Sequence, residues 1–148
     1  MSDILLLICC ILSGFCVGLF LQRRKTEQVL FLRDLTNYLS LLRANVSSKR
    51  IPLPGFNEQF SAQCSKGFAE YLSGSKTLPF PKNDATQINA FFDGLSCTNS
   101  DELLKHIDYY EKIFARLSSV YFDQADKQKG RYVKLGVLLG AMVGVLFL

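Results

Sequence analysis

Apolar residues gather at the two ends of the chain, and each end predicts a helix that spans a membrane. The run from Ile4 to Leu21 contains no charged residue, and its length of about 18 residues meets the lower limit for a transmembrane helix. The run from Leu135 to Leu148 is shorter. The two residues before Lys134, together with the long stem of that lysine, extend it toward the membrane surface. We therefore expect transmembrane helices over residues 1–21 and 132–148.

Between these runs, apolar residues recur every three or four positions, which is typical of amphipathic helices. The four series run from Thr26 to about Val46, from Phe56 to Leu72, from Ala85 to Leu95 and from Asp101 to about Gln128. No stretch alternates with a period of two, so no sheet is expected. We expect an all-α fold: a small cytoplasmic antiparallel helical bundle over residues 22–131, flanked by N- and C-terminal transmembrane helices.

Prolines and glycines mark where these helices end. Pro52 and Pro54 follow the first series, and neither can continue a helix, so a loop is expected there. Gly74 closes the second series. Gly130 stands between the last long helix and the C-terminal apolar run, and we expect it to be the joint between them.

Glycines in the two terminal runs recur four residues apart. The N-terminal run holds Gly14 and Gly18, and the C-terminal run holds Gly136, Gly140 and Gly144. Four residues are slightly more than one helical turn, so each set lies on nearly one face and leaves a shallow groove. Small residues with this spacing promote close packing of membrane helices. We expect these glycines to pack the two helices on each other or on neighbouring subunits.

Basic residues cluster beside both apolar runs and predict the topology. The formal net charge of the chain is +4, and these clusters account for much of it. Because basic flanks stay on the cytoplasmic side of a membrane, the central bundle is expected in the cytoplasm. The residues expected to set this topology are Arg23, Arg24, Lys25, Lys127, Lys129, Arg131 and Lys134. With the charge placed there, no nucleic-acid partner is expected, since that would require a basic stripe on the folded domain.

The sequence lacks the common signatures of an enzyme or a metalloprotein. It contains no phosphate-binding Gly-rich loop, and its single histidine, His106, has no Cys-x-x-Cys pair with which to build a metal site. We therefore expect no catalytic residues, no metal and no cofactor. His106 is expected to be a solvated helix residue, and Cys64 a small buried hydrophobe. The alternative is a membrane-anchored cysteine hydrolase in which His106 activates Cys64.

Three segments together point to a known family. They are "GLFLQRRK" at the end of the first apolar run, "SSKRIPLPGF" after the first amphipathic helix, and the terminal "KQKGRYVKLGVLLGAMVGVLFL". The most specific parts are Pro52-Leu53-Pro54 and residues 134–140. With this layout the chain resembles, over nearly its whole length, the stage III sporulation protein AB family.

The resemblance implies a component of the complex that mother cells of endospore-forming bacteria build around the forespore, in the mother-cell or outer forespore membrane. The cytoplasmic domain of the family is similar to the platform protein of type II secretion machines, which engages a cytoplasmic ATPase. The resemblance thus implies a non-enzymatic scaffold that binds the stage III sporulation ATPase (protein AA) and other complex members. Packing of the glycine faces on neighbouring subunits would make the chain a homo-oligomer. Candidate partner contacts are the loop residues Lys49, Arg50, Pro52 and Pro54 and the exposed charges Arg43, Lys112 and Arg116.

Overall fold

The computed structural model describes residues 2–48, 51–75, 77–96, 99–128 and 130–146, without the side chains of residues 2, 3, 6, 7 and 146. All regular elements in these ranges are α-helices, which confirms the expected all-α class. The helices are α1 (Ser2–Ser48), α2 (Leu53–Ser61), α3 (Lys66–Leu72), α4 (Lys82–Gly94), α5 (Ser100–Gln128) and α6 (Arg131–Leu146).

The chain divides into two compact units. Unit 1 combines Met1–Thr26 with Phe122–Leu148, and unit 2 is Glu27–Tyr121. Both α1 and α5 run through the boundary between the two units without a break. The limits expected for the central bundle, residues 22 and 131, stay a prediction.

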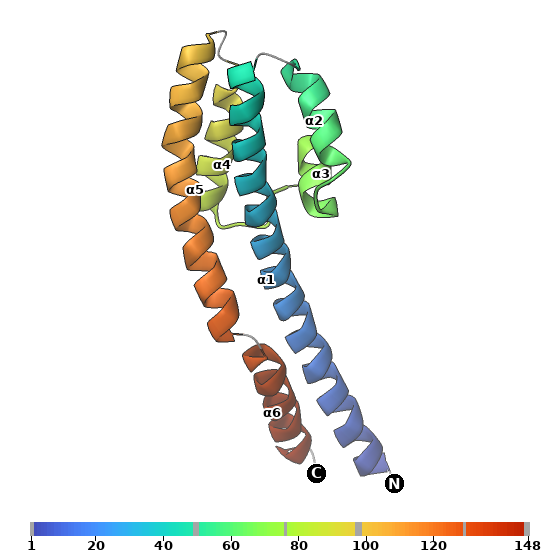
Figure 1. Ribbon diagram of the computed structural model, residues 1–148. Coiled ribbons are helices and arrows are strands. Elements are labelled where there is room, and N and C mark those ends of the chain that lie inside the picture. Colours follow the sequence, from blue (N-terminus) through green and yellow to red (C-terminus); the bar gives the residue numbers. More distant parts are fainter. Residues whose placement is uncertain (1, 49–50, 76, 97–98, 129, 147–148) are drawn as a thin grey trace. The chain divides into compact units, whose positions relative to one another are not determined.

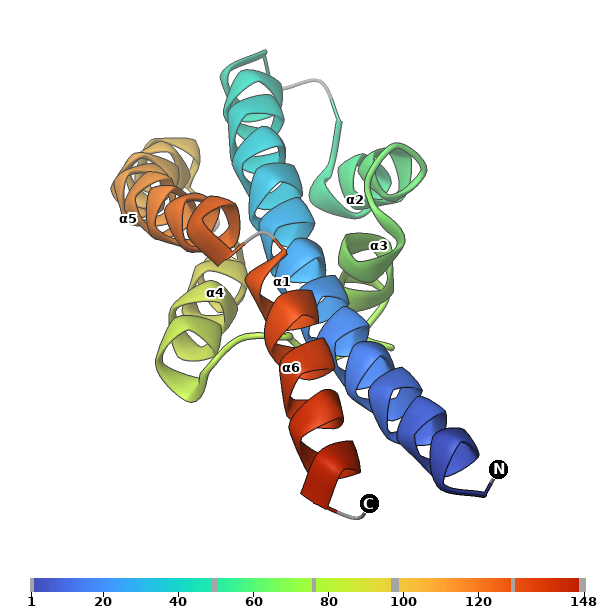
Figure 2. The ribbon, with the colours of Figure 1, turned by 90° about the horizontal axis from the view of Figure 1, so that it is seen from below.

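In unit 2, the part of α1 after residue 26 forms the centre of a small helical bundle. Helices α4 and α5 lie on one side of it, and α2 and α3 lie on the other (Figures 1 and 2). The predicted apolar stripe of α1 is confirmed, because Leu32, Leu35, Leu39 and Leu42 are all buried. Aromatic rings from the other helices pack around this stripe, as expected where a bundle has few residues with which to build a core.

The prediction of one helix from Phe56 to Leu72 is wrong. Helix α2 ends at Ser61 and α3 begins at Lys66, and the backbone N–H of Ser65 in the turn between them donates to Asp34 Oδ2 of α1 at 2.8 Å. The four-residue spacing continues across this turn because Phe60 and Phe68 reach the same core, with ring centroids 5.6 Å apart. Periodicity alone therefore did not reveal the break.

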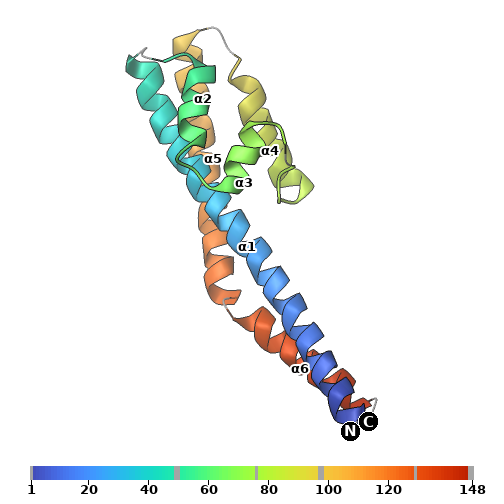
Figure 3. The same cartoon turned by 90° about the vertical axis from the view of Figure 1, so that its right-hand side faces the viewer.

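Unit 1 contains α6 beside the N-terminal part of α1 (Figure 3). The predicted joint at Gly130 is confirmed, because this residue lies between α5 and α6 and has a φ of 78°. A positive φ favours glycine, which has no Cβ to clash with the backbone. Over the described residues, no helix is long and apolar enough to cross a membrane.

Candidate functional site

The glycine faces of α1 and α6 meet each other within unit 1. A Cβ placed on Gly14 would overlap the carbonyl oxygen of Gly136, and a Cβ placed on Gly136 would overlap the carbonyl oxygen of Gly14. The two backbones are therefore in direct contact at this point, with no room for a side chain on either helix. Close approach of this kind requires small residues on both partners.

The contact extends one helical turn to each side of this pair. A Cβ on Gly18 would lie 2.7 Å from the carbonyl oxygen of Tyr132, and a Cβ on Gly140 would lie 2.6 Å from that of Cys10. Both distances are shorter than van der Waals contact. Gly144 is buried as well. We call this contact the glycine crossing; its role in assembly stays a prediction.

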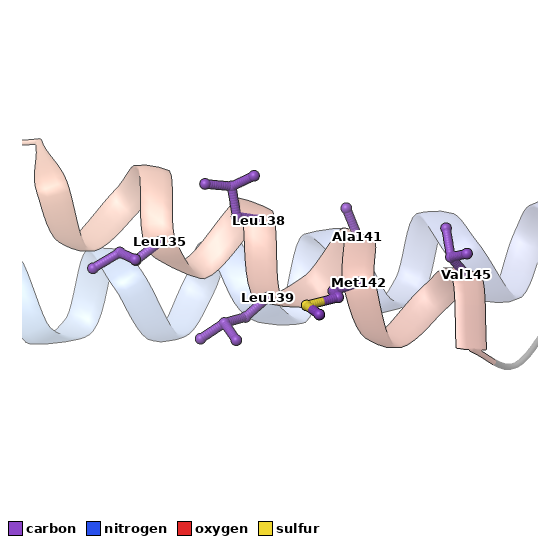
Figure 4. Close-up of a pocket in the computed structure, with 6 residues that line it drawn as sticks. All are labelled: Leu135, Leu138, Leu139, Ala141, Met142 and Val145. Carbon is purple, nitrogen blue, oxygen red and sulfur yellow. The ribbon is translucent and has the colours of Figure 1, made fainter.

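The opposite side of α6 carries a shallow apolar groove of about 610 Å³. Figure 4 shows its side chains on α6, with α1 behind them. They are Leu135, Leu138, Leu139, Ala141, Met142 and Val145. No titratable group lines this groove among the described residues, so it offers contact surface rather than chemistry.

The basic residues beside the apolar runs lie mostly at the surface of unit 1. Arg23, Arg24, Arg131 and Lys134 are exposed. Lys127 Nζ lies 2.7 Å from Asp123 Oδ2 one turn earlier in α5. Lys25 is half-buried, and Lys129 lies outside the described residues.

The candidate partner loop is attached to the end of α1. Lys49 and Arg50 lie outside the described residues, but Asn45 brackets the next residue: its Nδ2 donates to the Ile51 carbonyl at 2.7 Å and its Oδ1 accepts from the Ile51 N–H at 3.1 Å. Pro52 and Pro54 are both exposed. Pro52 is the N-cap of α2 and Pro54 is the second residue of that helix, so the expectation that Pro54 lies in a loop is wrong. The sequence did not predict these two hydrogen bonds of Asn45, because they depend on where the fold places the backbone of Ile51.

The exposed charges proposed as contacts are not equivalent. Arg43 is engaged, because its guanidinium lies 3.1 Å from Asp108 Oδ1 and 3.2 Å from Glu111 Oε2 of α5. It joins two helices of unit 2. Lys112 and Arg116 are exposed on α5.

The expectation of a solvated His106 is wrong. Its ring is half-buried, stacks on Phe91 with centroids 5.6 Å apart, and places Nε2 3.0 Å from the Phe91 carbonyl oxygen. A Cβ on Gly94 would overlap this ring. The His106 ring therefore occupies the space beside Gly94 between α4 and α5. Its Nε2 is hydrogen-bonded to the backbone of α4.

The thiol of Cys64 is in the turn between α2 and α3, half-buried and packed against the core. Its Sγ is 3.6 Å from the Ser61 carbonyl oxygen. Burial, and then the negative charge of Asp34, raise the pKa of this thiol, whereas a nucleophilic cysteine needs a lowered pKa. Within the described part of the chain, no hydrogen bond joins Cys64 to His106.

We expect Cys64 to be a slow nucleophile. In a variant that keeps only this cysteine, iodoacetamide should alkylate it at pH 8 several times more slowly than it alkylates a short cysteine peptide, because less thiolate is present. Asp34→Asn keeps the hydrogen-bond acceptor for Ser65 but removes the negative charge that raises the thiol pKa. This variant should therefore increase the rate at which Cys64 is alkylated. A rate above that of the peptide would contradict this account.

Buried tyrosines make the stability of unit 2 sensitive to alkaline pH. Burial raises the pKa of Tyr38, Tyr71 and Tyr121, and for Tyr71 burial followed by the charge of Asp93 raises it to about 12. Unfolded tyrosines ionise near pH 10. Stability from these groups is thus complete below pH 10 and falls as the pH rises toward 12.

This dependence is measurable by urea unfolding between pH 8 and 11. The midpoint should stay constant to about pH 9.5 and then decline. Tyr71→Phe should make the decline shallower, because one ionising group is removed from the unfolded state. A midpoint that rises with pH across this range would be the opposite of the expected sign.

Several residues that position this structure gave no sequence signal. Asp34, Asn45 and Gly94 act through partners that lie 12 or more residues away, or across a loop. No motif marks such residues, because each residue type is common in helices and loops. No protein-family model, curated protein or solved structure matches the chain.

Proposed function

We propose that this chain is a non-enzymatic membrane scaffold that anchors through unit 1 and presents unit 2 to a cytoplasmic ATPase. The observation that carries the proposal is the apolar surface of unit 1. Phe20, Leu138 and Met142 are 69%, 66% and 68% exposed, and many other large apolar side chains of α1 and α6 are exposed with them. A surface of this kind is costly in water and marks a membrane or protein contact.

The sequence supports a membrane as the cover for this surface. The apolar run from Ile4 to Leu21 has no charge, and exposed arginines follow it directly at Arg23 and Arg24. Lys134 directly precedes the C-terminal apolar run. Under the positive-inside rule, this arrangement supports a cytoplasmic location for unit 2.

The resemblance to the stage III sporulation protein AB family supports the identity of the partner. Under this proposal the chain belongs to the mother-cell complex needed for endospore formation, and the ATPase is stage III sporulation protein AA. The described contacts of Cys64 and His106 do not favour the hydrolase alternative, because the thiol pKa is raised and the histidine is bound to Phe91.

Two experiments test the proposal. Alkaline carbonate should leave the full chain in the membrane pellet, and a cysteine introduced at the exposed Ser73 should react with an impermeant maleimide only after the cells are opened. The ATPase should co-purify from detergent extracts of the membrane with wild-type chain and equally with Cys64→Ala. A chain that carbonate releases, or that recovers no ATPase, would count against the scaffold.

A further inference from the structure

The outer face of α5 in unit 2 carries three cations around an exposed tyrosine. Lys105, Lys112 and Arg116 are exposed, and Tyr109 between them is 63% exposed. Successive spacings of four, three and four residues place all four on one side of the helix, whereas Phe114 on the other side is in the core. We call these four residues the basic strip; it runs about 16 Å along the helix axis.

In the described part of unit 2, no ion pair neutralises the positive charge of the basic strip. Two acids beside the strip on α5, Asp108 and Glu111, pair with Arg43 of α1. Among the ion pairs of the described residues, none involves a cation of the strip. Three positive charges on one side of α5 therefore face solvent together. The sequence predicted Lys112 and Arg116 as partner contacts but not Lys105 or Tyr109, whose exposure depends on the fold.

The composition of the basic strip is that of a protein contact. Tyrosine and arginine are enriched at the centres of interfaces, where the ring supplies apolar area and the guanidinium binds carboxylates with two hydrogen bonds. Tyr109 exposes its ring between Lys105 and Lys112, so one partner segment can contact both the ring and the charges.

The N-terminal end of the basic strip limits what can bind it. Asp101 and Glu102, both exposed, precede Lys105 by about one turn of α5. An extended anionic surface, such as a membrane or a nucleic acid, would meet these two acids and be repelled by them. A short acidic segment of similar length would meet only the cations.

We propose that the basic strip is a docking surface for an acidic helical segment of a partner protein. Carboxylates at positions i, i+7 and i+11 of that segment would face the three cations, with an apolar residue against Tyr109. This inference rests on the proposed scaffold function, since it assigns the surface through which the scaffold engages its partner.

The probe is a fluorescein-labelled helical peptide of about 14 residues with glutamates in that register and leucine opposite the tyrosine. Anisotropy is measured with the full chain in a nonionic detergent. Lys112→Glu with Arg116→Glu should weaken binding about tenfold or more, because two attractions become repulsions. The matched control, Arg33→Glu with Lys82→Glu, makes the same charge change on exposed residues of α1 and α4 and should leave binding unchanged.

Two further comparisons separate docking from general charge attraction. Tyr109→Ala should weaken binding severalfold, and a peptide of the same composition in scrambled order should bind severalfold more weakly. Equal binding of the scrambled peptide, or equal loss in strip and control variants, overturns the proposal. Displacement by soluble dihexanoyl phosphatidylserine at the concentration of the peptide overturns it in favour of a lipid headgroup. An ATPase that co-purifies equally with wild-type and strip variants rejects the strip but leaves the scaffold intact.

Discussion

Gly136→Ala is expected to force α1 and α6 apart. The new methyl group would overlap the backbone oxygen of Gly14, and backbone cannot rotate away as a side chain can. The helices must therefore separate toward the spacing of about 8–10 Å that ordinary side chains impose. We expect unit 1 to lose about 1–3 kcal/mol of packing free energy, as in other overpacked contacts.

The separation is measurable between spin labels on Leu12 and Met142, both of which are exposed. With the native cysteines replaced by alanine, double electron–electron resonance should show a longer mean distance in the Gly136→Ala variant. Gly67→Ala is the matched control, because a Cβ there meets nothing within 4 Å. It should leave the distance unchanged and stabilise α3 by up to about 1 kcal/mol, the difference in helix propensity between glycine and alanine. An identical distance distribution in both variants would show that the crossing tolerates a side chain.

Tyr38→Ala is expected to destabilise unit 2 by about 3–5 kcal/mol, the usual cost of truncating a buried aromatic residue to alanine. Tyr38 is 0% exposed, and its ring lies among those of Phe56, Phe60 and Phe68, with centroids between 5.2 and 5.8 Å away. The removed ring leaves a cavity at the centre of the bundle, between α1 and the helices on both sides.

Tyr38→Phe separates the hydroxyl from the ring. The hydroxyl donates to Asn57 Oδ1 at 2.6 Å, so its loss should cost about 1 kcal/mol. Urea unfolding of the full chain in detergent, followed by circular dichroism, gives both values. Tyr109→Ala serves as control, because this ring is exposed and its loss should change stability by less than about 0.5 kcal/mol. Similar losses for Tyr38→Ala and Tyr109→Ala would mean that the aromatic cluster does not stabilise the bundle.

The elements with strong periodicity were predictable from sequence. The stripe of α1 was predicted because each leucine faces one continuous core, and α5 was predicted to within one residue at its start. The turn between α2 and α3 was not, because Asp34 of another helix binds the backbone of Ser65 there. The environment of His106 was missed for a similar reason, since the space it fills is left by Gly94 on α4.

For the candidate site, the sequence identified the right kind of residue but not its neighbours. Glycines four residues apart predict close packing on some helix, and only the fold places Gly14 against Gly136. In the basic strip, Lys112 and Arg116 were candidate contacts from the sequence. Only the fold shows that Arg43 pairs with the acids beside them.

The glycine crossing has a consequence for self-association. The glycine face of α1 packs against the backbone of α6, and the glycine face of α6 packs against the backbone of α1. A second copy of the chain can therefore bind these faces only if the two helices first separate. Oligomers formed through unit 1 must instead pack the bulky side chains on its outer sides against another subunit. In such contacts, the shape complementarity of the side chains determines which surfaces can pair.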